Sequence, residues 1–267
     1  MRAVALLSGG LDSTLAIRVM QDQDIEVNAI NFMSLFCTCT PKDSSCAAAK
    51  TAVEQLGVPL ETVNTSQEFV ELMKDPPHGY GSEVTPCLDC RIMMFRKARE
   101  YMEDIDARFL VTGEVLGERP MSQRREAMNL IEKEADVEGL VVRPLCAQHM
   151  EPSTPEEKGW VDRDQLLDIR GRNRTPQIEL AEEYDINDYP CPAGGCRLTD
   201  PGFASRVRDL LDNEPDFGAN DMQLLKVGRH FRLSPDSRAI VGRDQEENGR
   251  LWTLCGEDDT LLQLQDH

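Results

Sequence analysis

The sequence has no long hydrophobic run and no secretory leader. Its longest apolar stretches, residues 3–7 and the interrupted run 30–36, are far shorter than the roughly 20 residues that a membrane span needs. A charged and then apolar leader of secretory length is also missing, and the nine cysteines are an odd number that includes close pairs. We therefore expect a cytoplasmic protein in a reducing compartment, without a membrane anchor.

Positive charge is also in short supply. The 29 lysines and arginines face 48 aspartates and glutamates, and the formal net charge of −19 argues against a protein that coats nucleic acid with a uniformly positive surface. Seven of the cations are lysine and 22 are arginine, whose planar side chain binds phosphate or carboxylate through paired hydrogen bonds. Any contact with nucleic acid must therefore be local and made by arginines.

Short apolar runs alternate with longer segments of helical periodicity over the first two thirds of the chain. The expected strands are residues 3–7, 27–32, 60–63, 108–111 and 140–142, and the expected helices are residues 13–20, 47–56, 91–101 and 124–135. The alternation is typical of an α/β fold, a doubly wound parallel sheet with helices on both faces. From Pro190 onwards glycine and proline become frequent, and shorter strand-like pieces follow at residues 227–233 and 239–241. We predict a main domain over residues 1–200 and a small α+β domain over residues 201–267.

The first expected strand runs into S-G-G-L-D-S-T at residues 8–14, where a helix begins. Its glycines allow successive backbone N–H groups to point at one anion, hydroxyls add donors, and the helix N-terminus favours a phosphate there. A carboxylate at Asp12 would repel phosphate unless it holds a magnesium ion or orients a loop donor, which suggests metal-assisted nucleotide chemistry. The chain has neither G-x-x-x-x-G-K-[ST] nor G-x-G-x-x-G. The alternative is a plain strand-to-helix turn in which Asp12 and Ser13 cap the helix.

The motif at residues 8–13 resembles the S-G-G-x-D-S signature of the PP-loop ATP pyrophosphatases. That family splits ATP between its α and β phosphates and uses it to adenylate a carbonyl or amide oxygen. The resemblance implies an adenine nucleotide alpha hydrolase-like fold, ATP with Mg²⁺ on the loop, and a catalytic role for Asp12. We also expect the adenine to lie near the end of the second strand. The predicted ATP-binding residues are Ser8, Gly9, Gly10, Asp12, Ser13, Thr14, Phe32 and Gly113.

A second segment narrows the resemblance. Residues 112–123, T-G-E-V-L-G-E-R-P-M-S-Q, resemble T-G-E-x-x-G-Q-x-x-S-Q of the tRNA 4-thiouridine synthetases, with Glu118 where that family more often has Gln. The next strand, V-R-P-L at residues 142–145, is similar as well. Those synthetases carry an RNA-binding region ahead of this domain, whereas the present sequence starts at the first strand.

The resemblance implies an ATP-dependent tRNA sulfurtransferase, with residues 1–200 as its ATP-binding catalytic domain. A uridine carbonyl would attack the α-phosphate, pyrophosphate would leave, and sulfide or a persulfide carrier would displace AMP. The expected partners are tRNA and a sulfur donor. Two alternatives are a PP-loop enzyme that adenylates a small-molecule carboxylate or amide, and a non-catalytic RNA-binding or metal-storing module.

A C-x-x-C motif, Cys87 to Cys90, opens an expected helix. A dithiol at this spacing serves as a redox disulfide, as half of a zinc site or as part of an iron–sulfur cluster. Several sulfur-inserting PP-loop enzymes use such a pair and one distant cysteine to hold a cluster with one open iron for sulfide. The resemblance therefore implies that Cys87, Cys90 and Cys196 hold a catalytic 4Fe-4S cluster. Zinc, with Cys191 as a fourth ligand, and ligand-free thiols are the alternatives.

A second group of cysteines, Cys37, Cys39 and Cys46, follows the second expected strand, on the side where a doubly wound sheet binds ligands. The group fits a persulfide relay or a metal site, and equally well incidental reduced thiols on a loop. Cys146 and Cys255 are isolated, and we expect them to be structural.

Two regions are candidates for contact with RNA. Arginines follow the T-G-E segment and gather again around Gly171, where they would track a phosphate backbone or pair with nearby acids: Arg119, Arg124, Arg125, Arg163, Arg170, Arg172 and Arg174. Residues 227–233 and 239–248 resemble the small RNA-binding domain of the NFACT proteins around its V-G-R-x-x-x-x-N motif. We predict salt-sensitive tRNA binding that is lost when residues 201–267 are deleted.

Overall fold

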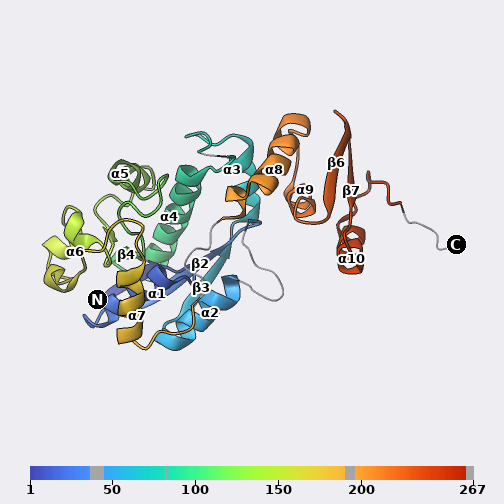
Figure 1. Ribbon diagram of the computed structural model, residues 1–267. Helices are drawn as coiled ribbons and strands as arrows, with labels where there is room; N and C mark the ends of the chain where they lie inside the picture. The colour runs from blue at the N-terminus through green and yellow to red at the C-terminus, as the bar shows by residue number, and fades with distance from the viewer. Residues whose placement is uncertain (37–44, 82, 190–195, 263–267) are drawn as a thin grey trace.

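The computed structural model describes residues 1–36, 45–81, 83–189 and 196–262. Its centre is a five-stranded parallel sheet in the order β3-β2-β1-β4-β5 (Figure 1). The strands are β1 (Arg2–Leu6), β2 (Glu26–Met33), β3 (Leu60–Asn64), β4 (Phe109–Thr112) and β5 (Val141–Val142). Each coincides with one of the expected runs. The prediction of a doubly wound α/β fold is confirmed.

Alternate residues of β1 supply two cores on opposite faces of the sheet. Ala3 and Ala5 pack in one core with the helices α1 (Leu11–Gln21), α2 (Ser45–Leu56) and α7 (Thr175–Glu183). Val4 and Leu6 pack in the other core with α4 (Cys87–Asp104) and α5 (Arg125–Glu134). A strand buried on both faces must be apolar throughout, which explains why residues 3–6 of β1 form a continuous hydrophobic run.

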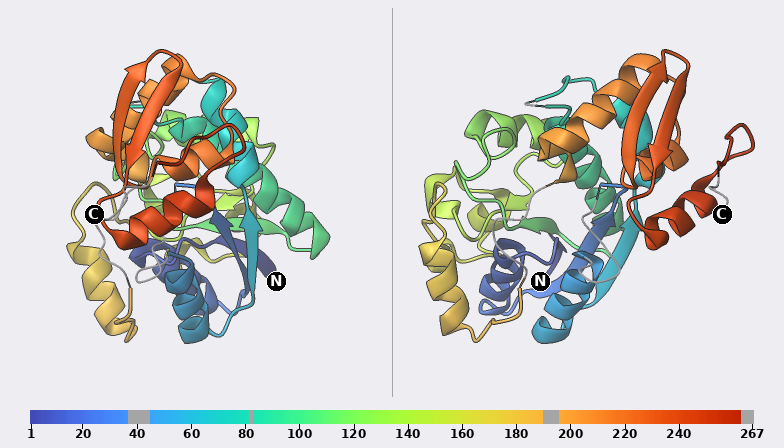
Figure 2. Two further views of the ribbon diagram at one scale, coloured as in Figure 1. Left: turned by 90° about the vertical axis from the view of Figure 1, so that its right-hand side faces the viewer. Right: turned by 45° about the vertical axis from the view of Figure 1, so that its right-hand side comes forward.

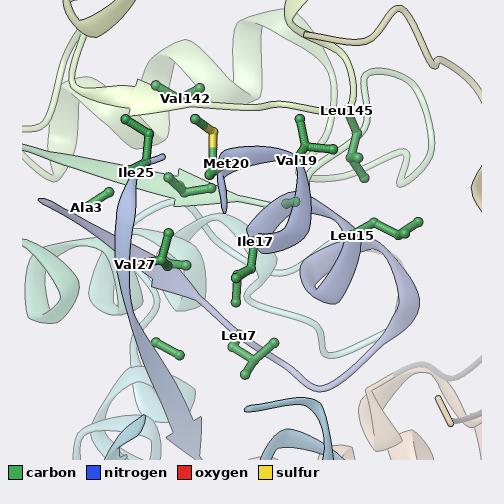
Figure 3. Packing of buried hydrophobic residues seen from close by; sticks show 14 of the residues in the cluster. Ala3, Leu7, Leu15, Ile17, Val19, Met20, Ile25, Val27, Val142 and Leu145 are labelled. Carbon is green, nitrogen blue, oxygen red and sulfur yellow. The ribbon is translucent and has the colours of Figure 1, made fainter. Parts of the chain in front are cut away.

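The first core surrounds α1, which the sheet covers on one side and α7 on the other. Figure 3 shows Ile17 and Met20 of α1 among Val27, Val142 and other apolar side chains of this core. Because both sides of α1 are covered, nearly all of its side chains are buried. The start of this helix, which carries the glycine loop, is therefore rigidly placed.

Several helices lie outside the predicted set. They are α3 (Ser66–Lys74), the short α6 (Thr154–Glu157) and α7, together with 3₁₀ turns at Ala147–His149, Arg163–Gln165 and Arg197–Thr199. Within the described ranges, no helix combines the length and the apolar character needed to cross a bilayer.

The C-terminal part begins with α8 (Pro201–Asn213) and α9 (Ala219–Leu224), which pack on α3. Phe36 stands at the centre of this packing, with its ring centroid 5.0 Å from that of Phe69 and 5.9 Å from that of Phe203. The antiparallel strands β6 (Arg229–Ser234) and β7 (Ser237–Val241) and the helix α10 (Gln245–Leu254) lie beyond α9 (Figure 2). We call β6, β7 and α10 the hairpin unit. Residues 201–225 thus share a core with the main domain, and only the hairpin unit extends from it.

Candidate functional site

The glycine loop connects β1 to α1, and hydroxyl groups order it from within. The hydroxyls of Ser13 and Thr14 donate to the carbonyl oxygen of Gly10 at 2.9 and 3.1 Å. The N–H of Gly10 donates to the Ser8 hydroxyl at 3.3 Å. The three predicted hydroxyl residues are therefore gathered at one point, and their contact with phosphate stays a prediction.

Gly9 lies where no other residue fits. Its φ of +76° is in the left-handed region, and an added Cβ would collide with the backbone nitrogen of Ala49 and lie 2.5 Å from the carbonyl carbon of Ala48. These two alanines belong to the first turns of α2. The loop therefore lies against α2 while it leads into α1, and the start of α1 carries partial positive charge.

Gly113 brings the second motif onto the loop. Leu6 of β1 and Thr112 of β4 are paired in the sheet, so both motifs leave the sheet side by side. A Cβ on Gly113 would lie 2.5 Å from the carbonyl carbon of Asp12 and 2.5 Å from the nitrogen of Ser13. The backbone of the T-G-E segment therefore touches the first turn of α1, and only glycine permits this approach. Residues 8–14 and 112–123, with Arg143 and Arg174 described below, form what we call the nucleotide-loop region.

Arg174 bridges two carboxylates of this region. One amino group pairs with Asp12 Oδ2, and the other, Nη2, donates to Glu118 Oε1 at 2.8 Å. Arg174 stands just before α7, on a segment that is docked through the N–H of Gly171 to the carbonyl oxygen of Leu116 at 2.8 Å. The sequence grouped Arg174 with arginines that would track RNA or pair with nearby acids, and the structure places it beside the glycine loop, paired with two carboxylates. Sequence reasoning missed this role because 162 residues separate Arg174 from Asp12.

Glu118 is a carboxylate in an unfavourable environment. Its pKa is raised to about 7, mainly by burial and then by the neighbouring Asp12 carboxylate, against the opposing charges of Arg174, Arg119 and Arg91. Within the described part of the chain, Asp12 Oδ1 and Glu118 Oε2 are buried without a hydrogen-bond partner. Carboxylate oxygens are ligands that Mg²⁺ accepts, so the donor set fits the predicted cation.

A buried ionic network supports the T-G-E segment from behind. Glu114 is 2% exposed and accepts from Arg143 Nε at 3.1 Å, while Arg91 Nη2 lies 3.3 Å from its other oxygen. Arg143 also pairs with Glu132. Burial opposes the charge of Arg143, but the two carboxylates outweigh it and raise the pKa of the guanidinium. The network fixes the ends of β4 and β5, and the signal for it was one charged residue within three positions after each expected strand.

Phe32 and Cys146 lie outside the nucleotide-loop region as defined above. Phe32 is half-buried near the end of β2 and packs against the core on the α4 side; its predicted contact with adenine is untested. The Cys146 thiol donates to the carbonyl oxygen of Glu114 at 3.2 Å, and burial raises its pKa to about 11. A neutral, buried thiol of this kind has a structural role.

The C-x-x-C motif begins α4, as predicted. Cys87 and Cys90 are both half-buried and lie one turn apart. Between them, buried Asp89 accepts from the N–H of His78 at 3.1 Å and lies 2.7 Å from Nδ1 of the same residue. Asp89 thus ties the loop before α4 to the start of the helix and holds the two thiols in place.

Cys196 reaches the same neighbourhood from the other direction. It is exposed, and Leu198, two residues further on, belongs to the buried cluster against which Cys90 packs. Among the described residues, no three His, Cys, Asp or Glu side chains come together as a metal-binding group. The cluster at Cys87, Cys90 and Cys196 therefore stays a prediction. Cys37, Cys39, Cys191 and the Cys46 side chain lie outside the described residues.

Known proteins match this chain in sequence and in fold. The family described as "Thiamine biosynthesis protein (ThiI)" matches residues 1–152. A "Probable tRNA sulfurtransferase" of Ureaplasma parvum serovar 3 is 31% identical over 184 residues, which are 67% of this chain and 42% of that protein. A "Probable tRNA sulfurtransferase" of Thermococcus kodakarensis is 24% identical over 194 residues, 71% of this chain and 45% of that protein. The chain thus spans less than half the length of these relatives.

Among solved structures, one described as "Crystal structure of a 4-thiouridine synthetase - RNA complex with bound ATP" matches with a TM-score of 0.50 and 20% identity. The match covers 84% of this chain and 52% of that one. At this identity the likeness shows a common fold.

Proposed function

The chain belongs to the ThiI family, and we propose that it is an ATP-dependent tRNA sulfurtransferase that replaces a uridine carbonyl oxygen with sulfur. One observation carries the proposal: the glycine loop and the T-G-E segment meet at the carboxyl ends of β1 and β4, with Gly113 against Asp12 and Ser13. Ligands of doubly wound sheets bind at this end of the strands. The names of the two relatives and of the solved structure, which holds RNA and ATP, support the same reaction.

The proposed reaction has two steps. The uridine oxygen attacks the α-phosphorus of ATP, the bond to the bridging oxygen breaks, and pyrophosphate leaves with the electron pair. Sulfide from the donor then attacks the activated carbon, and AMP leaves with the former carbonyl oxygen. The loop N–H groups and the start of α1 would offset the phosphate charge, and Asp12 would hold the accompanying Mg²⁺. The chain would act mainly by positioning and charge neutralisation.

We propose Cys87, Cys90 and Cys196 as the ligands of a 4Fe-4S cluster that supplies the sulfur chemistry. The fixed turn between the first two thiols and the shared cluster of Cys90 and Leu198 support this placement. Anaerobic reconstitution followed by iron, labile sulfide and zinc analysis tests it. We expect about four irons per chain, and loss of the cluster in Cys87→Ser but not in Cys255→Ser. Stoichiometric zinc without labile sulfide would contradict the proposal.

We place the RNA contact on the hairpin unit. Arg229 and Phe231 lie two positions apart on the same exposed face of β6, and Trp252 is 64% exposed on α10. Exposed aromatic side chains beside arginine suit stacking on single-stranded bases. By contrast, the V-G-R-x-x-x-x-N motif serves local structure, because the side chain of Asn248 lies where a Cβ on Gly242 would be.

The tRNA of cells that lack the protein provides the decisive test. Mass spectrometry of its nucleosides should show the loss of one thiolated uridine, restored by the wild-type chain and not by Asp12→Asn. A matched control, Asp24→Asn, changes an exposed aspartate in a turn that asparagine tolerates and should restore it fully. Pyrophosphate release without RNA would indicate a small-molecule substrate, and ATP binding without turnover a non-catalytic module.

A further inference from the structure

Arg174 belongs to the nucleotide-loop region but to neither of its two sequence motifs. Its guanidinium holds Asp12 on the first turn of α1 and Glu118 on the T-G-E segment at the same time. The side chain is 21% exposed, so the pairing is neither deep in the core nor at the open surface. A cation at this position faces the ligand end of the sheet.

The pairing leaves charge uncompensated. Two carboxylates share one guanidinium, and each keeps a buried oxygen without a hydrogen-bond partner among the described residues. Buried polar atoms are normally paired, and a catalytic role or a bound ion is among the explanations for an exception. The arrangement is therefore compatible with an exchange of partners by Arg174, Asp12 and Glu118 when a ligand binds.

A nucleoside triphosphate with a divalent cation supplies both sets of new partners. Carboxylates are ligands for the cation, and the planar guanidinium binds phosphate oxygens through two parallel hydrogen bonds. Exchange of carboxylates for phosphates keeps Arg174 paired throughout, so its movement does not leave a buried charge unpaired.

We propose that Arg174 is a phosphate-binding residue for the pyrophosphate portion of ATP, and that Asp12 and Glu118 hold it when nucleotide is absent. The inference rests on the proposed function, since it assumes ATP as the substrate. During the first step, negative charge collects on pyrophosphate as the bond to the α-phosphorus breaks, and a guanidinium held there stabilises the leaving group.

Titration calorimetry of the full chain with ATP or AMP, each with Mg²⁺, tests the inference. Arg174→Met should weaken ATP binding about 10- to 100-fold, as expected for the loss of a charge-assisted pair, and should change AMP binding less than about twofold. Arg174→Lys should fall between, because it keeps the charge and loses the paired geometry. Arg18→Met is the matched control, since Arg18 forms an exposed pair with Asp22 on the same helix as Asp12. It should bind both nucleotides normally.

A second variant separates binding from mere support of the fold. In titrations with ATP alone, where no cation ligand is lost, Glu118→Gln should loosen the hold on Arg174 and tighten ATP binding about two- to tenfold. Equal losses of ATP and AMP binding in Arg174→Met, or unchanged ATP binding, would overturn the inference. A wild-type chain that binds and splits ATP but thiolates no tRNA would instead refute the proposed function and leave the role of Arg174 standing.

Discussion

The nucleotide-loop region and the hairpin unit both depend on arginine–carboxylate pairs, but in opposite surroundings. Arg143 is 4% exposed between Glu114 and Glu132. In the hairpin unit, Arg232 is 20% exposed and pairs with Asp209 at 2.6 Å, a residue that is itself 40% exposed. A buried charge that loses its partner is strongly destabilising, whereas a pair that water partly reaches contributes less. In the first region the pairs hold the ends of β4 and β5 in place. In the second, the pair only helps to attach β6 to α8.

Removal of one arginine from each region should give the largest contrast. Arg143→Met leaves Glu114 and Glu132 buried without their main partner, and we expect a loss of about 3–5 kcal/mol in the free energy of unfolding. Arg232→Met should cost at most about 1 kcal/mol. Urea titration followed by circular dichroism measures both. Equal losses would mean that the difference in burial has no energetic consequence.

A glycine-to-alanine substitution should be harmful in the nucleotide-loop region and stabilising in the hairpin unit. Gly113→Ala forces the T-G-E segment away from Asp12 and Ser13, and we expect ATP binding to weaken about 100-fold, or roughly 2.7 kcal/mol. Gly249 lies within α10 with open space around its Cβ position. Gly249→Ala should therefore stabilise the chain by up to about 1 kcal/mol and leave ATP binding unchanged. Titration calorimetry measures ATP binding, and thermal denaturation measures stability. Normal ATP binding by Gly113→Ala would contradict the close contact between the T-G-E segment and α1.

The exposed aromatic residues test whether the hairpin unit has a binding role of its own. Phe231→Ala and Trp252→Ala should each weaken tRNA binding about 5- to 10-fold, at the low end of the energy of one stacked base. Leu233→Ala is the control, because this residue is 70% exposed on the same strand but is not aromatic. Fluorescence anisotropy at two salt concentrations measures the affinity. If all three variants bind like wild type, RNA contacts another surface.

A fall in pH should change the contributions of the two regions to the free energy of unfolding in opposite directions. The pKa of Glu118 is raised to about 7 from 4.5, so the folded chain binds this proton more tightly than the unfolded chain does. The protonated side chain therefore contributes to the free energy of unfolding at low pH, and this contribution is lost as pH rises from about 4.5 to 7. Burial, mainly, lowers the pKa of His230 to about 4 from 6.5, so its contribution is lost as pH falls from about 6.5 to 4.

The variants Glu118→Gln and His230→Gln isolate these two effects. The melting temperature of Glu118→Gln minus that of wild type should increase by about 2–4 °C as pH rises from 6 to 7.5. His230→Gln should gain a similar amount as pH falls from 6.5 to 5. Differential scanning calorimetry across this range measures both, and parallel pH profiles for the two variants would contradict the assigned environments.

The sequence predicted the elements that depend on local pattern. All five strands of the central sheet coincide with predicted runs, and α1, α2, α4 and α5 each lie within a few residues of the predicted bounds. Helices α3 and α7 are only nine residues long, and α7 carries a proline in its first turn, where a helix tolerates it. Short length and proline hide such helices from a reading of periodicity.

The candidate site was predictable only in part, for a related reason. The glycine loop and Gly113 were found because each motif is contiguous in sequence. Arg174 and the pairing of Arg143 with Glu114 depend on which segments become neighbours in space, and no local pattern encodes that. A charged residue one or two positions after a buried strand was the available signal for Arg143 and Glu114.

The packing of Phe36 between Phe69 and Phe203 limits how this chain can be recombined. A cut at residue 200 would strip α8 and α9 from α3 and expose a buried apolar surface. A junction between Leu225, which belongs to that cluster, and Gly228, whose Cα lies against the carbonyl group of Val241, would leave both sides intact. The transferable module is therefore the hairpin unit, and a chimaera that exchanges it with a relative should keep the fold of everything before it.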